Sequence, residues 1–296
     1  MKELEGIYPA TVTPLGDDGR LDAPAMRKVV RHQLDAGVDG MYICGGTGEG
    51  LLLSREERQE ALETVVDEVN GEAAVVAHVG AFQTDETIAL ARHASKAGAD
   101  AIAALPPAYF YRPDDEALTR YYAAISEASD VRVLIYNIPQ RTGITMTEAL
   151  FDRLLAMGNV VGMKDSSGDI AAMGHFMRRD PAPVIFEGED TVLLAALLAG
   201  ACGGIGATYN IMPHLYVRLW KAFQAKDMDG AAAAQLRVNE ITRALTVVDL
   251  FGGIKQTMRW MGLECGDPHT PNRALTQDET VTLRSSLESV GFFEEG

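Results

Sequence analysis

The stretch Val160-Val161-Gly162-Met163-Lys164-Asp165-Ser166-Ser167-Gly168 contains an apolar run, one lysine and a small polar turn. An apolar run without alternation is typical of a parallel β-strand that is covered on both faces. The polar residues 165–168 then turn the chain away from that strand. We therefore interpret the stretch as a buried strand with Lys164 at its carboxyl end, followed by a loop.

Seven other apolar segments have this form, and each is followed by a turn and a helical pattern. The eight predicted strands are Ile7–Leu15, Val38–Gly45, Ala74–Gly80, Ala99–Pro106, Val131–Ile138, Val160–Lys164, Pro183–Glu187 and Gly203–Ala207. Eight strand–helix units match a (β/α)8 TIM barrel, whose usual size is about 250 residues. An open doubly wound sheet is the alternative. Its nucleotide-binding form needs a Gly-x-Gly-x-x-Gly turn after the first strand, and Thr11-Val12-Thr13-Pro14 stands there instead. The predicted fold class is therefore α/β, a (β/α)8 TIM barrel.

The last part of the chain has a helical pattern only. We expect the barrel to occupy residues 1–225 and a C-terminal helical appendage, packed on the barrel, to occupy residues 226–296. Its predicted helices are Asp229–Val248, Gly253–Met261 and Thr276–Val290. Earlier in the chain, Ser54 and Glu57 form a capping-box pattern, and the residues predicted to cap other helices are Asp22, Asp114 and Thr145.

Composition excludes several classes of protein. The 296 residues carry 42 acidic and 26 basic side chains, a net charge of −16 that repels nucleic acid and anionic lipid. No apolar stretch approaches the roughly 20 residues of a membrane span, and the first residues lack an apolar signal segment. Three scattered cysteines, Cys44, Cys202 and Cys265, do not make a disulfide framework. We expect a cytoplasmic protein with no nucleic-acid or membrane partner.

The unusual residues fall where a barrel places its active site, at the carboxyl ends of the strands. These positions are Gly45-Gly46-Thr47-Gly48-Glu49, Tyr109, Tyr136–Gly143 and Lys164. A lysine that loses part of its hydration there can act as an amine and attack a carbonyl group, which is Schiff-base chemistry. The alternative is a strand-end lysine whose ammonium reaches solvent. The convergence of four segments on one rim favours the Schiff-base interpretation.

The other segments suggest supporting roles. Gly46, Thr47 and Gly48 can direct backbone amides at an anion such as a carboxylate, although a plain glycine turn would look the same. The segment lacks the lysine of a phosphate-binding loop, and Glu49 would repel phosphate. Tyr136 can relay protons beside a lysine or be an interior aromatic with a satisfied hydroxyl group.

Arg141 can hold a second substrate carboxylate or pair with a surface acid. Tyr109 lies in the aromatic loop Pro106–Pro113, which either covers the site or meets another subunit. His78 is predicted to be a buried, hydrogen-bonded imidazole. The sequence has no His-Glu-x-x-His motif and no metal-spaced cysteine pair, so we expect neither a metal nor another cofactor.

Four motifs carry a resemblance to a known family: Gly-Gly-Thr-Gly-Glu at 45–49, Tyr-Asn-Ile-Pro at 136–139, Gly-Met-Lys-Asp at 162–165 and Gly-Gly-Ile-Gly-Ala-Thr-Tyr-Asn at 203–210. In order and spacing the chain resembles the dihydrodipicolinate synthase and N-acetylneuraminate lyase family. The resemblance implies a metal-free class I aldolase in which Lys164 forms an imine with pyruvate or another 2-keto acid. It also implies that Tyr136 shuttles a proton, that Thr47 and neighbouring amides hold the keto acid's carboxylate, and that Tyr109 crosses a subunit interface. The implied assembly is a homotetramer built as a dimer of dimers.

By the same resemblance, further residues are assigned to substrate binding: Gly46, Gly48, Arg141, Ser166, Gly188, Asp190, Ile205 and Ala207. The chain departs from the family at Gly46, where a hydroxyl residue is common, and at Thr191 and Ala207, which replace an acid and a hydroxyl. We therefore expect a lyase that joins or splits pyruvate and an aldehyde and acts on a 2-keto-3-deoxy acid. The alternatives are a dihydrodipicolinate synthase that condenses pyruvate with aspartate semialdehyde, and a catalytically weak barrel that senses keto acids.

Overall fold

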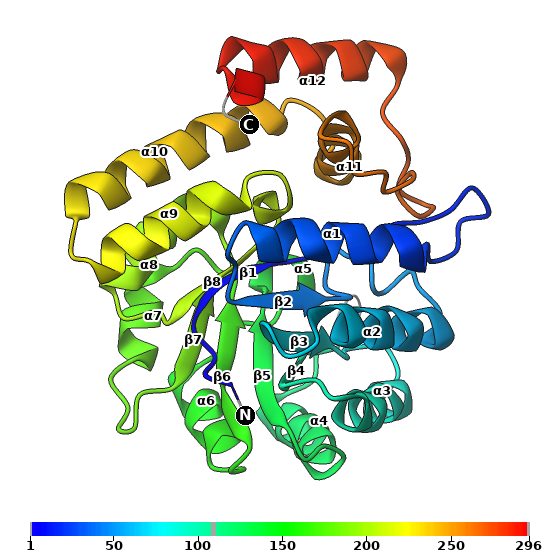
Figure 1. The fold of residues 1–296 in the computed structure, drawn as a ribbon. Helices are drawn as coiled ribbons and strands as arrows, with labels where there is room; N and C mark the ends of the chain where they lie inside the picture. The colour runs from blue at the N-terminus through cyan, green and yellow to red at the C-terminus, as the bar shows by residue number, and fades with distance from the viewer. Residues whose placement is uncertain (1, 108–110, 295–296) are drawn as a thin grey trace.

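The computed structural model describes residues 2–107 and 111–294, and they form a closed parallel barrel (Figure 1). The strands are β1 (Gly6–Pro9), β2 (Gly40–Ile43), β3 (Ala74–His78), β4 (Ala101–Ala104), β5 (Arg132–Asn137), β6 (Val160–Asp165), β7 (Val184–Glu187) and β8 (Gly203–Gly206). They pair in the order β1-β8-β7-β6-β5-β4-β3-β2. A parallel bridge between Ala10 and Tyr42 joins the two ends. The predicted TIM barrel is confirmed.

The first strand is shorter than the predicted Ile7–Leu15. The chain leaves the sheet after Pro9, and the hydroxyl group of Thr13 donates a hydrogen bond of 2.6 Å to the carbonyl oxygen of Gly48. The segment after β1 therefore supports the loop after β2 instead of extending the barrel.

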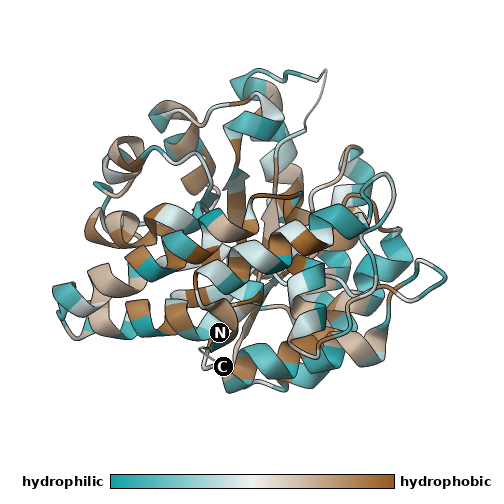
Figure 2. Cartoon of the chain, turned by 90° about the horizontal axis from the view of Figure 1, so that it is seen from above, coloured by the Kyte–Doolittle hydropathy of each residue, from teal (hydrophilic) through white to brown (hydrophobic). Residues whose placement is uncertain are grey.

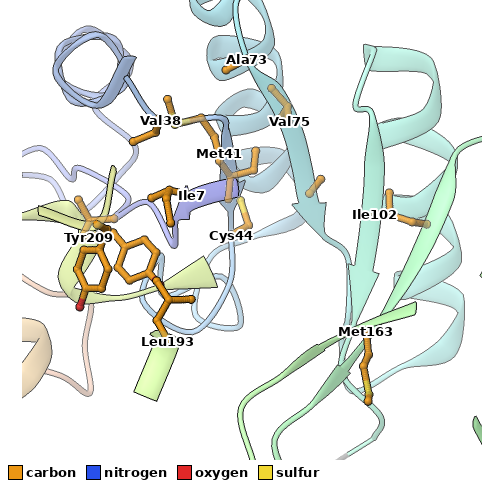
Figure 3. Close-up of a cluster of buried hydrophobic side chains, with 14 of the residues drawn as sticks. Ile7, Val38, Met41, Cys44, Ala73, Val75, Ile102, Met163, Leu193 and Tyr209 are labelled. Atoms are coloured by element: carbon orange, nitrogen blue, oxygen red, sulfur yellow. The ribbon is translucent and has the colours of Figure 1, made fainter. Parts of the chain in front are cut away.

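Apolar side chains fill two layers, because successive residues of a strand point to opposite faces of the sheet. The inner layer, inside the barrel, contains Tyr8, Tyr42, Leu134, Phe186 and Ile205 among others. The outer layer packs the strands against the surrounding helices. Figure 3 shows part of this layer, with Ile7, Met41 and Val75 from the strands close to Val38 and Cys44. Covering on both faces explains why the strand sequences are mostly apolar, with their polar residues at or near the strand ends.

Helices alternate with the strands and surround them. They are α1 (Ala23–Asp35), α2 (Arg55–Val69), α3 (Thr84–Ala97), α4 (Asp115–Glu127), α5 (Pro139–Thr142), α6 (Glu148–Leu155), α7 (Ile170–Phe176), α8 (Leu193–Leu198) and α9 (Pro213–Gln224). Asp22 and Asp114 cap α1 and α4, and Ser54 with Glu57 makes the predicted capping box of α2. The prediction for Thr145 is wrong. Thr147 caps α6 by accepting a hydrogen bond from the Leu150 amide, so the helix begins two residues later.

Three further helices follow the barrel: α10 (Met228–Leu245), α11 (Leu250–Trp260) and α12 (Gln277–Ser289). They lie together beside α9 and α1 in Figure 1, so the predicted helical appendage is present. The boundary at residues 225 and 226 stays a prediction. Figure 2 shows hydrophilic residues on the outward faces of many helices and hydrophobic residues towards the barrel. None of the helices in residues 2–107 and 111–294 combines the length and apolar character that a bilayer crossing requires.

Candidate active site

Lys164 lies in β6 with its side chain 4% exposed. Its Nζ is 4.5 Å from the ring centre of Tyr42 and 4.6 Å from the ring centre of Tyr136. In the part of the chain that the structure describes, Nζ makes neither an ion pair nor a hydrogen bond. The lysine predicted as the nucleophile therefore lies near the barrel mouth between two aromatic rings, and no carboxylate of the described residues lies within ion-pair distance of it.

Tyr42, His78 and Tyr136 form an aromatic cluster around this amine. The rings of Tyr42 and Tyr136 are 6.1 Å apart, and those of His78 and Tyr136 are 5.8 Å apart. Burial raises the pKa of Tyr42 well above its usual value, with a smaller contribution from Tyr136. Sequence reasoning missed Tyr42. Its inward position in a predicted strand was the available signal.

His78 is a neutral imidazole in this cluster. Burial, and then the positive charges of Arg58 and Lys164, lower the pKa of His78 well below its usual value. Its Nδ1 lies 3.1 Å from the carbonyl oxygen of Cys44, which can only accept, so Nδ1 carries the proton. The Leu105 amide donates to the other ring nitrogen at 3.4 Å. The prediction of a buried, hydrogen-bonded imidazole is confirmed.

Gly188 and Ser166 bound the space around the lysine side chain. A Cβ atom at Gly188 would lie 2.0 Å from Oγ of Ser166 and 3.0 Å from Cε of Lys164. The Gly188 amide donates a hydrogen bond of 2.7 Å to the Asp165 carbonyl oxygen, which holds its backbone in place. Only glycine fits this position without displacing the Ser166 side chain and crowding the lysine. Of the residues predicted for the site, Lys164, Tyr136, Ser166 and Gly188 are thus brought together directly.

The loop after β2 presents Gly46 and Thr47 at the same rim, Gly46 exposed and Thr47 half-buried. Gly48 is buried, and a Cβ there would lie 2.8 Å from the Thr11 carbonyl oxygen. At Gly46, in contrast, a Cβ would have no heavy atom within 4 Å. Packing therefore does not require glycine at position 46, and the missing hydroxyl group leaves open space beside the site.

Two buried acids, Asp165 and Glu187, lie at neighbouring positions of β6 and β7, and each is 1% exposed. One oxygen of Glu187 accepts hydrogen bonds from the amides of Gly188 and Glu189, at 2.9 and 2.6 Å. Burial raises the pKa of Glu187 to about 8, and the nearby Asp165 adds to this; burial also raises the pKa of Asp165. Two like charges this close disfavour each other, so the pair retains a proton near neutral pH. Sequence reasoning missed this pair.

Asp190, Ala207 and Ile205 belong to β8 and to the turns that follow β7 and β8, the next two strands after β6 in the sheet. The Asp190 carboxylate accepts 2.7 Å hydrogen bonds from the amide and hydroxyl groups of Thr208, and a 3.2 Å bond from the Ala207 amide. Its hydrogen bonds thus go to the loop after β8. Ala207 is half-buried, and Ile205 is fully buried inside the barrel.

The two remaining predicted residues are not joined to this cluster by any described contact. Arg141 is exposed on α5, and Tyr109 lies outside the described residues. Among residues 2–107 and 111–294, no group of three or more histidine, cysteine or acidic side chains is arranged to hold a metal ion.

Comparison with known proteins shows which family this chain is similar to. The model of the Dihydrodipicolinate synthetase family matches residues 3–290. The N-acetylneuraminate lyase of Citrobacter koseri is 35% identical over 274 residues, which cover 91% of this chain and 92% of the relative.

Solved structures agree in fold. A catalytic lysine mutant of the Ruminococcus gnavus sialic acid aldolase superimposes with a TM-score of 0.94 at 32% identity, covering 100% of this chain and 99% of the other. A prophage protein of E. coli K12 from the dihydrodipicolinic acid synthase family, in complex with pyruvate, gives a TM-score of 0.92 at 28% identity, covering 97% and 99%.

Proposed function

Because the chain belongs to the Dihydrodipicolinate synthetase family and is a lyase of the class I aldolase type, we propose that Lys164 forms its imine with pyruvate or a 2-keto-3-deoxy acid. The observation that supports this most is the buried, unpaired amine between two tyrosine rings. A sialic acid aldolase of similar sequence and fold has a catalytic lysine, and a pyruvate complex exists for another relative.

The chemistry follows from the amine. Unprotonated Nζ attacks the keto carbon and a carbon–nitrogen bond forms. The keto oxygen takes one proton from the nitrogen and a second from Tyr136 and leaves as water, which gives a protonated imine. In the cleavage direction the bond between C3 and the hydroxyl-bearing C4 of the keto acid breaks. The hydroxyl group gives its proton to Tyr136 as C4 becomes the aldehyde carbon, and the electron pair of the broken bond moves into the imine, which becomes an enamine. Protonation of the enamine carbon and hydrolysis then release pyruvate. In the synthetic direction the enamine attacks the aldehyde.

The surrounding residues transfer the proton, bind the carboxylate and shape the site. Tyr136 transfers the proton to and from the substrate oxygen, since its ring lies beside Nζ. Thr47 and the amides of Gly46 and Gly48 bind the keto acid's carboxylate. Ser166 and Gly188 shape the space in which the imine forms.

The other assigned residues bind the rest of the substrate. Ile205 closes the barrel interior beneath the site, and Ala207 lines the rim with Asp190 behind it. Arg141 is exposed and suits a second anionic group of the substrate. Tyr109 completes the site from a neighbouring subunit.

Our proposed substrate is a 2-keto-3-deoxy acid other than sialic acid. The Asp190 carboxylate is occupied by backbone and hydroxyl donors, and the Thr191 hydroxyl donates to Glu189 at 2.9 Å. Ala207 offers no polar side chain. These positions therefore present few free groups for a long polyol chain, which distinguishes the site from one built for sialic acid.

We also propose a homotetramer in the cytoplasm. Leu51 and Phe82 are 42% and 56% exposed and line one cavity of about 480 Å³. Exposed apolar side chains in one place are typical of protein interfaces. The three cysteines are unpaired, as is usual in a reducing compartment.

Borohydride reduction in the presence of pyruvate tests the proposal. We expect a covalent pyruvate-derived mass on a peptide that contains Lys164, and Lys164→Ala should abolish it. Pyruvate binding without any trapped adduct would reject the mechanism and favour a keto-acid sensor. A screen of 2-keto-3-deoxy acids for pyruvate release then identifies the substrate, while robust turnover of aspartate semialdehyde would favour a synthase.

A further inference from the structure

The Gly45–Glu49 loop is held from outside the barrel by helix α11 and by the segment that follows it. Lys255 of α11 places Nζ 2.9 Å from Oε1 of Glu49, and the two side chains are 3% and 1% exposed. An ion pair excluded from water keeps one geometry, because neither partner can exchange the other for solvent without a large penalty.

The contacts of this ion pair extend beyond α11. The second oxygen of Glu49 accepts hydrogen bonds from the His269 amide at 2.8 Å and from Nδ2 of Asn272 at 3.0 Å. Nζ of Lys255 also donates to the Asp267 carbonyl oxygen at 3.1 Å. One loop residue is therefore bound by both a helix and the segment after it.

The backbone of the loop depends on such support. Glu49 has a φ of 54° and Cys44 a φ of 56°, both in the left-handed region that non-glycine residues seldom adopt. Such residues persist when surrounding contacts hold them. Within the loop, the Glu49 amide donates a hydrogen bond of 3.0 Å to the Gly46 carbonyl oxygen. At its end, the Gly50 amide donates one of 3.0 Å to the Gly45 carbonyl oxygen. The direction of the loop's amides thus depends on how Glu49 is held.

We propose that Glu49 and Lys255 are positioning residues that orient the amides of residues 46–48 for the substrate carboxylate. The C-terminal extension then supports the active site as well as the fold. This inference rests on the proposed function, in which that loop binds the keto acid's carboxylate.

Two single variants and their combination test it. Glu49→Gln keeps an oxygen that accepts from His269 and Asn272 but turns amide donors towards Lys255. Lys255→Met removes the ammonium group and keeps a side chain of similar length. The readout is the pyruvate concentration that gives half-maximal borohydride trapping on Lys164, measured well below the melting temperature. We expect it to rise at least tenfold in each single variant.

The double variant Glu49→Gln/Lys255→Met separates positioning from stability. It buries no unpaired charge, so it folds even if a single variant does not. We expect its melting temperature to recover relative to the single variants while the half-maximal pyruvate concentration stays at least tenfold raised. Lys96→Met, at an exposed site on α3, is the matched control. It should show the half-maximal pyruvate concentration of the unmodified protein.

The outcomes distinguish the two proposals. If the unmodified protein traps pyruvate and the double variant does so within twofold of the same concentration, the pair is only structural and this inference is wrong. If the unmodified protein traps no pyruvate, the proposed function itself fails, and the positioning role fails with it.

Discussion

At the scale of single residues, the site depends on the absence of certain side chains and ion-pair partners as much as on the residues that are there. Lys164 has no described ion-pair partner, Gly188 has no side chain to displace it, and Gly46 leaves open space at the rim. The first two features act on the space around the Lys164 side chain, and the third acts at the rim. Substitutions that refill this space should therefore change chemistry more than stability.

Gly188→Ala tests the space beside the lysine. The added methyl group would overlap with Oγ of Ser166, which must move, and would crowd Cε of Lys164 at 3.0 Å, so the lysine side chain loses space next to the amine. We expect the rate of pyruvate trapping to fall at least tenfold. The measurement is the time course of adduct formation by mass spectrometry.

Gly174→Ala is the matched control, since a Cβ there would meet no heavy atom within 4 Å. It should trap pyruvate at the unmodified rate. Equal rates for the two alanine variants would show that Gly188 does not constrain the lysine.

At the scale of elements, neighbouring strands bring together groups that are far apart in the chain. The pairing of β6 with β7 places Asp165 opposite Glu187. The turns that follow both strands contain residues assigned to the site, Ser166 and Gly188. The protonation of this acid pair is therefore coupled to the stability of the strands beneath the rim.

Glu187→Gln should change how stability depends on pH. The folded protein raises the pKa of Glu187 from 4.5 to about 8, so the folded state binds the proton more tightly than the unfolded state. The stabilisation from this group is present below pH 4.5 and is lost as the pH rises towards 8. Glutamine does not titrate. We therefore expect the melting temperature of the unmodified protein, relative to Glu187→Gln, to fall steadily between pH 5 and 8.

Thermal unfolding of the two proteins across that pH range is the measurement. Asp165 is present in both, so its own titration contributes to each curve. A constant difference between the two melting temperatures would mean that Glu187 is ionised throughout and that the pair shares no proton.

At the scale of the whole molecule, the exposed apolar side chains identify a candidate subunit interface. Phe82→Asp places a charge in the patch that includes Leu51, and burying that charge between subunits would be costly. We expect smaller assemblies in sedimentation velocity. Val281→Asp, at a 57% exposed position on α12, is the control. An unchanged assembly in both variants would place the interface elsewhere.

The sequence by itself determined the alternation of strands and helices, because continuous apolar runs identify buried parallel strands and turn residues separate them. It also determined that Lys164, Tyr136 and the Gly45–Glu49 loop share one rim, since all strand ends of a barrel meet there. It misplaced the end of the first strand and the cap at Thr145, because a few residues of local pattern do not show which hydroxyl group faces an amide.

Only the tertiary structure decided which side chains touch. Tyr42 next to Lys164, Glu187 beside Asp165, and Lys255 on Glu49 are contacts between segments distant in the chain. Their energies depend on burial and on distances of a few ångströms, which the barrel's closure and the packing of α11 set. Periodicity along a sequence predicts which face a residue occupies, but the partner it meets is fixed by how separate elements pack in three dimensions.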